Sequence, residues 1–309
     1  MKIISKFKQL KREIKLVIIT ALLASCVGVY ATGECIISAT ADDVSYKNTT
    51  VQAAIDELFA MSEDYCPPGY ECIKPAIIKE TTYYDETAFK SSTYKHKIKT
   101  ITLDDQINLP SNVIESWDIG EHQNGDVMAY VTQNIDDNTM YDLYIQGDGN
   151  LYANPDSSYL FYDLRAVDKI NGINKLNISK VSNMIGMFGR IGYNSSVFTL
   201  DLGNNFDTSN VKNMRNMFNE TGYNSPIFTL DLGDKFDTSN VLDMERMFSG
   251  TGYNSTVFTL DLGDKFNTSN VTDMTHMFSY VGHNNPVFTL DLGNNFDTSN
   301  VKKNVLYVL

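Results

Sequence analysis

The sequence has few of the residues on which most enzymes depend. Its 309 residues include only four histidines and four cysteines. The histidines, at positions 96, 122, 276 and 283, stand in no HExxH-type arrangement. Neither a GxSxG element nor a phosphate-cradling glycine loop occurs. We therefore expect no enzyme, no cofactor and no metal centre. Repeated carboxylates leave an envelope-polymer hydrolase as a distant alternative.

Positive charge is also scarce. Lys and Arg number 25 against 38 Asp and Glu, for a net charge of −13. Six of the basic residues lie within the first fifteen positions, so the rest of the chain is more acidic than the total. Phosphate binding depends on Lys and Arg, and this balance therefore excludes nucleic acid as a partner. The acidity favours solubility, and binding of metal or of a cationic partner stays open.

The N-terminal 31 residues have the order of a secretory signal. A basic stretch precedes the apolar run 16–24, and small residues continue to Ala31. Val29–Ala31 fits a cleavage site, and Leu23–Cys26 resembles a lipobox in which Cys26 would be lipidated. The apolar run is marginal for a membrane-spanning helix, and an uncleaved anchor is the third alternative. We expect residues 1–31 to be a signal peptide or membrane anchor, and the protein to be exported to the bacterial surface or secreted.

Residues 32–75 are predicted to form a short helical stalk and a cysteine loop. Thr49–Gln52 has the form of a capping box, and apolar residues recur at helical spacing through Phe59. This helix either belongs to a stalk or oligomerisation element or packs on the next domain. Cys66 and Cys72 flank a Pro-Pro-Gly turn, which favours a disulfide over a metal site.

A thirty-residue repeat dominates the C-terminal half. Thr208–Val211 recurs with the sequence Thr-Ser-Asn-Val at Thr238, Thr268 and Thr298, and Phe198–Gly203 recurs at the same interval. In each period Val211, Met214, Met217 and Phe218 have the spacing of one helical face. Thr208 or Ser209 is suited to cap that helix. Phe198, Leu200 and Leu202 alternate with polar residues, as in a strand.

This pattern predicts an α/β repeat solenoid, with one strand and one short helix in each thirty-residue coil. Residues 171–309 are its expected extent. The β-rich segment 76–170 is placed to cap its first coil, and it contains strand-like runs at 98–103, 126–132 and 141–145. The methionines share the phase of Val and Phe, which indicates a core role rather than soft-metal binding.

The period also predicts rows of identical side chains. Threonines from Thr199 onward and aspartates from Asp201 onward should align about 4.8 Å apart on neighbouring coils. A solvated aspartate row with incidental cation binding is favoured over a calcium site, because single carboxylates offer few of the oxygens that calcium prefers. Asn210 and its equivalents should hydrogen-bond turn backbone inside the coil.

Several segments carry a family resemblance: Val113–Asp118, Gly125–Tyr130, Tyr141–Gly147 and the Thr-Ser-Asn-Val-x-x-Met-x-x-Met-Phe repeats. With these the chain resembles the BspA-like leucine-rich-repeat surface proteins over about residues 76–300. The resemblance implies surface display and, in some members, adhesion to host matrix proteins or cells. The thirty-residue period is longer than that family's usual repeat, and the added residues lie around Tyr193 and its equivalents.

We therefore expect a cell-surface adhesion protein whose repeats bind a host matrix protein or a cell-surface glycan, with membrane attachment through the N-terminus. Repetition suits several weak contacts acting together. A surface spacer without a ligand is the alternative. The candidate ligand-binding residues are Tyr193, Tyr223, Tyr253, His283, Asp231 and Asp261.

Overall fold

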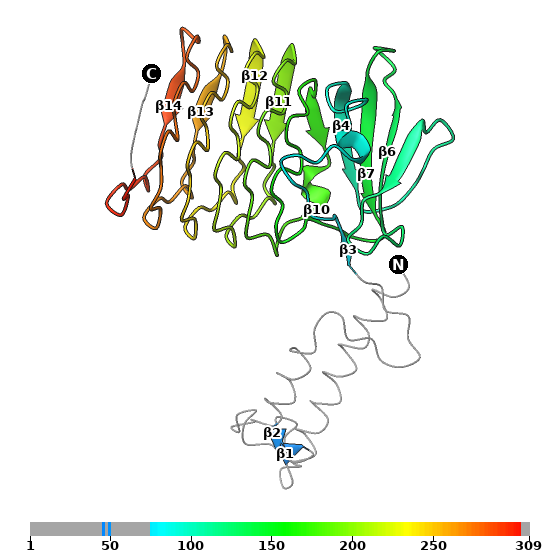
Figure 1. Ribbon diagram of the computed structural model, residues 1–309. Coiled ribbons are helices and arrows are strands. Elements are labelled where there is room, and N and C mark those ends of the chain that lie inside the picture. The colour runs from blue at the N-terminus through cyan, green and yellow to red at the C-terminus, as the bar shows by residue number, and fades with distance from the viewer. Residues whose placement is uncertain (1–44, 47–48, 51–74, 304–309) are drawn as a thin grey trace, which may run out of the picture. The chain divides into compact units, whose positions relative to one another are not determined.

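The computed structural model describes residues 45–46, 49–50 and 75–303 (Figure 1). The chain divides into two compact units, Met1–Lys74 and Pro75–Leu309. In the first unit, strands β1 (Ser45–Tyr46) and β2 (Thr49–Thr50) pair antiparallel. The threonines predicted to cap a helix therefore lie in a strand. The rest of that helix, the export segment, Cys26, Cys66 and Cys72 lie outside the described residues.

The first part of the second unit, which we call the cap (residues 76–170), consists mainly of strands. The three long strands confirm the runs predicted from the sequence, and a single turn of 3₁₀-helix, η2, precedes them. The cap elements are β3 (Ala76–Ile77), η2 (Ala88–Lys90), β4 (Ile98–Asp104), β5 (Glu115–Asp118), β6 (Val127–Gln133), β7 (Tyr141–Gly147) and β8 (Leu151–Tyr152).

The main sheet runs from the cap into the repeats without a break. Strand β9 (Lys169–Asn171) pairs in parallel with β4 on one side and with β11 (Val197–Asp201) on the other. The seven-stranded order is β12-β11-β9-β4-β7-β6-β5, and only the β7-β6 and β6-β5 pairs are antiparallel. The cap thus continues the parallel sheet of the repeats and ends it with an antiparallel hairpin and edge strand.

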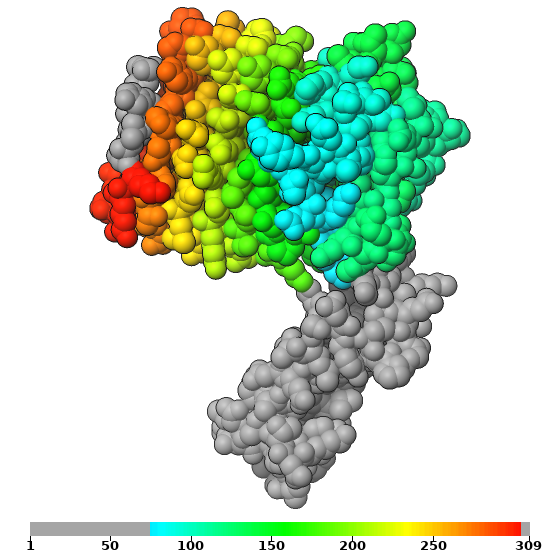
Figure 2. Space-filling view, viewed as in Figure 1, coloured from blue at the N-terminus to red at the C-terminus, as the bar shows by residue number. Residues whose placement is uncertain are grey.

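The repeats, which we call the solenoid (residues 171–303), stack as successive coils, seen in Figure 1 as parallel loops from green to red. Strands β11 and β12 (Ile227–Asp231) pair in parallel in register, as do β13 (Thr259–Asp261) and β14 (Thr289–Asp291). In the first coil, η3 (Ile173–Lys175) leads into β10 (Leu176–Asn177), which joins β8 and β3 in a small parallel sheet. In Figure 2 the coils form adjoining bands against the cap.

The predicted α/β fold class is wrong, because the described residues of the solenoid contain no α-helix. The stretch around Met214–Phe218 is a run of consecutive turns. Asn216 and Glu220 adopt left-handed backbone angles, with φ of 56° and 55°. The backbone N–H groups of Met214 and Phe218 donate to the carbonyls of Asp243 and Met247 in the next coil, at 3.0 and 2.9 Å. The solenoid is therefore built almost entirely from short strands and turns.

The prediction failed because the spacing of apolar residues does not distinguish a helix from a run of turns. Successive turns return a side chain to the core every three or four residues, as a helix does, so the apolar pattern fits both. An α-helix uses its N–H groups within itself, whereas here alternate N–H groups bond to the neighbouring coil. Gly186 and Gly250 occupy the positions equivalent to Asn216 and Glu220, and glycine tolerates the left-handed conformation best. Those glycines are the sequence signal that favours turns.

The core of the solenoid consists of rows of identical side chains. The methionines of the repeats are fully buried, which confirms their predicted role in the core; they are Met184, Met187, Met214, Met217, Met244, Met247, Met274 and Met277. Phe188, Phe218, Phe248 and Phe278 stack with centroids 5.4–5.8 Å apart. Each coil thus covers the apolar face of the one before it, and burial of these rings is a main source of stability.

Polar side chains also form hydrogen bonds between coils. The buried Thr208 hydroxyl, predicted to cap a helix, donates to the carbonyl of Asp237 in the next coil at 2.8 Å. Asn210 was predicted to bond inside its own coil, but its Nδ2 donates to the carbonyl of Ser179 in the preceding one at 2.9 Å. Because every coil offers the same carbonyls, such bonds recur along the stack.

Candidate binding surface

Tyr193, Tyr223, Tyr253 and His283 stack on one another at a corner of the solenoid, and we call them the tyrosine row. The centroids of successive rings lie 4.8, 4.5 and 4.9 Å apart. The Arg165 guanidinium from the cap covers the first ring, 5.2 Å from its centroid. Burial, followed by the neighbouring tyrosines, raises the pKa of Tyr223.

This packing limits what the tyrosine row offers to a ligand. Both faces of Tyr193, Tyr223 and Tyr253 are covered by their neighbours, so these rings have no free face on which a sugar or aromatic group would stack. The half-buried tyrosines present ring edges, and only His283 at the end of the row is exposed. The row therefore stabilises the coil-to-coil packing first, and any contact with a partner is through edges and hydroxyl groups.

The outer face of the solenoid sheet carries three further rows. An apolar row (Val197, Ile227, Val257, Val287), a threonine row (Thr199, Thr229, Thr259, Thr289) and an aspartate row (Asp201, Asp231, Asp261, Asp291) are all exposed. The alignment predicted for threonine and aspartate is confirmed in the β11–β12 and β13–β14 pairs. Strands β12 and β13 belong to different sheets.

The apolar row was missed in the sequence. Its four side chains are 46, 48, 56 and 63% exposed, in order along the chain. The signal was available: in Val197–Asp201, Phe198 and Leu200 point inward, so the alternation places a β-branched apolar residue on the polar face in every copy. Val197 and Ile227 are register partners on β11 and β12, and Val257 and Val287 hold the equivalent positions before β13 and β14. Together they form an exposed apolar strip, a feature that marks interaction surfaces.

The aspartate row is held rigidly. Oδ1 of Asp201, Asp231, Asp261 and Asp291 accepts the backbone N–H of the glycine two residues on, at 2.8–2.9 Å. This bond orients each carboxylate at the end of its strand. Among the described residues no group of three or more His, Cys, Asp or Glu side chains is arranged to hold a metal ion.

The structure does not bring all the candidate ligand-binding residues into one patch. Tyr223 lies four residues before Ile227, at the corner that leads into β12, whereas Asp231 ends that strand. Tyr253 and Asp261 repeat the arrangement one coil later. The tyrosine row and the aspartate row are therefore separated by the width of the sheet face, with the apolar and threonine rows between them.

A network of charges lies within the cap. Asp163, which is 6% exposed, accepts contacts from Lys95 Nζ at 3.1 Å, His96 Nε2 at 3.2 Å and Arg165 Nε at 2.6 Å. Burial raises the pKa of Asp163, but the hydrogen bonds from Arg165, His96 and Lys95 outweigh it and hold the pKa below its usual value. His96 is thus part of a structural network.

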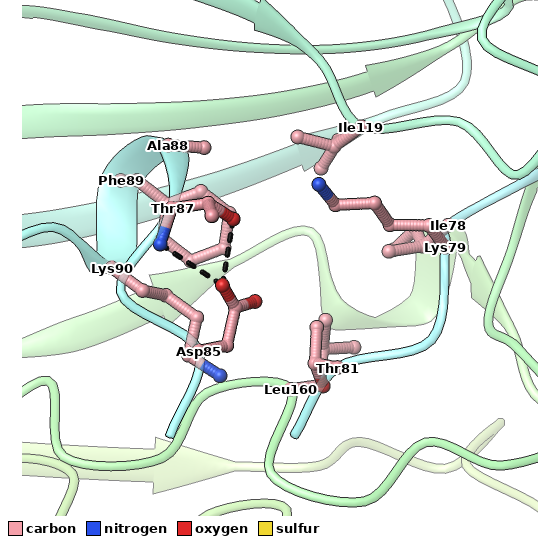
Figure 3. A pocket seen from close by; sticks show the side chains of 10 residues that line it. All are labelled: Ile78, Lys79, Thr81, Asp85, Thr87, Ala88, Phe89, Lys90, Ile119 and Leu160. Carbon is pink, nitrogen blue, oxygen red and sulfur yellow. Dashed lines mark hydrogen bonds between the residues drawn. The ribbon is translucent and has the colours of Figure 1, made fainter. Parts of the chain in front are cut away.

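One cavity lies in the cap and another at the border between the cap and the first coils. The first, shown in Figure 3, has a volume of about 10 Å³, close to the space for one water molecule. Beside it the buried Lys90 donates to the carbonyl of Tyr159 at 2.7 Å, and burial lowers its pKa to about 8. The second, an open groove of about 340 Å³ where the cap meets the first two coils, is lined mostly by amide and hydroxyl side chains.

One family model matches the repeats. Residues 156–289 and 223–306 match the family described as "Mycoplasma protein of unknown function, DUF285". None of the curated proteins or solved structures compared with the chain matches it. The solenoid is therefore similar to a family whose description assigns no activity, and the resemblance to BspA-like proteins stays a prediction.

No helix among the described residues is long and apolar enough to cross a membrane. The segment predicted to direct export, with Cys26, and the predicted Cys66–Cys72 disulfide precede residue 75 and lie outside the second unit's described residues.

Proposed function

We propose that this chain is a non-enzymatic binding protein of the bacterial surface, and that it holds a protein partner on the outer face of its solenoid sheet. The apolar row carries the proposal. Its valine and isoleucine side chains are about half exposed on four consecutive coils. An exposed apolar strip of this kind marks a surface that binds a partner. The N-terminal signal-like segment supports display outside the cell.

The shape of the face supports the same proposal. A regular sheet gives a flat, rigid surface that needs no rearrangement to bind, and rigid surfaces lose little entropy on association. Identical coils offer the same contact several times, so weak individual contacts act together. Host matrix proteins and proteins of neighbouring cells are the partners that we propose.

The test is binding of the purified full chain to immobilised matrix proteins and to whole cells, with an Ile227→Ser/Val257→Ser variant beside it. We expect saturable binding that the variant weakens at least tenfold while its circular dichroism spectrum is unchanged, because exposed side chains contribute little to folding.

Two further measurements in the same binding assay test the tyrosine row and the aspartate row. A Tyr223→Phe/Tyr253→Phe variant tests the tyrosine row, and EDTA tests for a cation on the aspartate row. Retained binding in the Ile227→Ser/Val257→Ser variant would contradict the proposed face. Absence of binding by the folded chain across the panel would favour the surface spacer instead.

A further inference from the structure

The three rows run along the coil stack on the outer face of the sheet. On β11 and β12 the apolar and the aspartate residues stand four residues apart, which corresponds to about 13 Å at the rise of a β-strand. The threonine row lies between them. The rows cross the strands, and their repeat is the spacing of the coils, about 4.8 Å.

These dimensions match an α-helix better than an extended chain. A helix with its side chains is about 10–12 Å wide and advances about 5.4 Å per turn. Three steps between four coils cover about 14 Å, and three helical turns cover about 16 Å. An extended strand repeats the side chains of one face about every 6.6 Å. Its mismatch with the coil spacing is therefore about three times that of a helix.

Addition of a strand to the sheet is a poorer match. The rows lie on the face of the sheet, and the backbone groups of β11 and β12 already bond to each other. A partner that approaches this face meets side chains only. Side-chain recognition at a helical interval requires residues at i, i+3, i+4 and i+7, which is the pattern of an amphipathic helix.

The negative charge of this face favours a helix that carries positive charge. The aspartate row carries one carboxylate per coil, and Asp234 and Asp264, which are also exposed, stand three residues beyond it on the two middle coils. Lys235 and Lys265 offset part of this charge, and the net remains negative. Lys169 aligns with Thr199 at the cap end, so a basic partner is favoured over the coils and disfavoured beyond them.

We propose that the outer face binds a basic amphipathic helix of a partner protein, laid along the coil stack over the threonine row. Its Lys and Arg side chains face the aspartate row and its aliphatic side chains face the apolar row. About three helical turns span the four coils. This inference rests on the proposed function and names the class of partner segment.

The experiment uses the full chain and a labelled peptide of about 18 residues, made of Leu, Ala and Lys with Leu on one face and Lys on the adjacent one. Three matched peptides accompany it: a scrambled sequence of the same composition, one with two central prolines, and one with Glu for Lys. Fluorescence anisotropy at low salt measures each dissociation constant. We expect the helical basic peptide to bind at least tenfold more tightly than each of the other three.

Variants of the protein locate the site. We expect Asp231→Asn/Asp261→Asn and Ile227→Ser/Val257→Ser each to weaken the helical peptide about fivefold. The matched control is Asp207→Asn/Asp297→Asn. These two aspartates also accept a backbone N–H two residues on, but they lie beyond the strands, outside the three rows. The control is expected to bind as the unaltered chain does.

Two outcomes would overturn the inference. Equal affinity for the helical and the proline-containing peptide would show that the face does not select a helix, and the proposed function would still stand or fall on the binding panel. Equal loss in the row variants and in the Asp207/Asp297 control would show a general charge effect instead of a docked helix.

Discussion

The cap and the solenoid bury polar groups in different ways. In the cap, Asp163 is matched by three side chains of different kinds, and Lys90 reaches a single carbonyl. In the solenoid, Thr251 and Thr221 each donate to a phenylalanine carbonyl 33 residues earlier, at the same distance of 2.7 Å. The cap therefore depends on individual arrangements, whereas the solenoid repeats one arrangement.

This difference predicts how much stability a substitution costs in each region. A solenoid coil is stabilised by its two neighbours, so an inner coil should lose more than an end coil from the same substitution. A cap residue has no equivalent elsewhere, so its contribution depends on its own surroundings. Three substitutions test this comparison, beginning with the largest expected effect.

The first compares an inner with an outer position of one phenylalanine row. Phe228 is 1% exposed and packs between Phe198 and Phe258, at 5.4 and 4.7 Å. We expect Phe228→Ala to lower the free energy of unfolding by about 3–5 kcal/mol. Phe288, partly buried in the last described coil, should lose about half as much when replaced by Ala. Urea unfolding measures both, and equal losses would contradict the nearest-neighbour view.

The second concerns Lys90 in the cap. Its pKa falls from 10.5 in the unfolded chain to about 8, first because of burial. Between these values the unfolded chain binds more protons, so stability should rise with pH across that window and be lowest below it. Lys90→Met removes the penalty and should add about 2–3 kcal/mol near pH 7 after loss of the bond to Tyr159.

Thermal unfolding from pH 7 to 10.5 measures this effect. The Lys90→Met chain should lose the rise in stability that the unaltered chain has between about pH 8 and 10.5. Lys97→Met, at an exposed position of the same region, is the control and should leave the profile unchanged. A rise of the same size in both variants would mean that another group titrates in this window.

The third and smallest effect concerns a threonine hydroxyl. Thr251 is fully buried and donates to the carbonyl of Phe218 at 2.7 Å. We expect Thr251→Val to cost about 1 kcal/mol because it removes this bond from a repeated position. Thr229→Val, on the exposed face, should change stability by less than about 0.5 kcal/mol. Urea unfolding of the two variants gives the comparison, and a larger loss at Thr229 would be inconsistent with its exposure.

The sequence was sufficient for the parts of the fold that depend on identity between repeats. The thirty-residue period, the in-register strands from Val197 to Asp201 and the buried methionines follow from it directly. The three long cap strands were also predictable, because their alternation is that of ordinary strands.

The predicted helix was wrong because side-chain spacing carries no information about where the backbone N–H groups bond. That choice is decided by left-handed residues such as Asn216, and Asn is less diagnostic there than the glycines of other coils. The candidate surface was predicted in part: the aspartates are exposed, but the stacking of tyrosine faces depends on the corner geometry. The apolar row was overlooked because isolated exposed valines are common, and only alignment makes them a strip.

The bonds between coils have an evolutionary consequence. Each coil donates N–H groups to both neighbours and accepts them from both, at positions that recur every thirty residues. Recombination between repeats that removes or duplicates thirty residues therefore leaves every donor opposite an acceptor. A lineage can thus change the length of its exposed face one coil at a time, without redesigning the core.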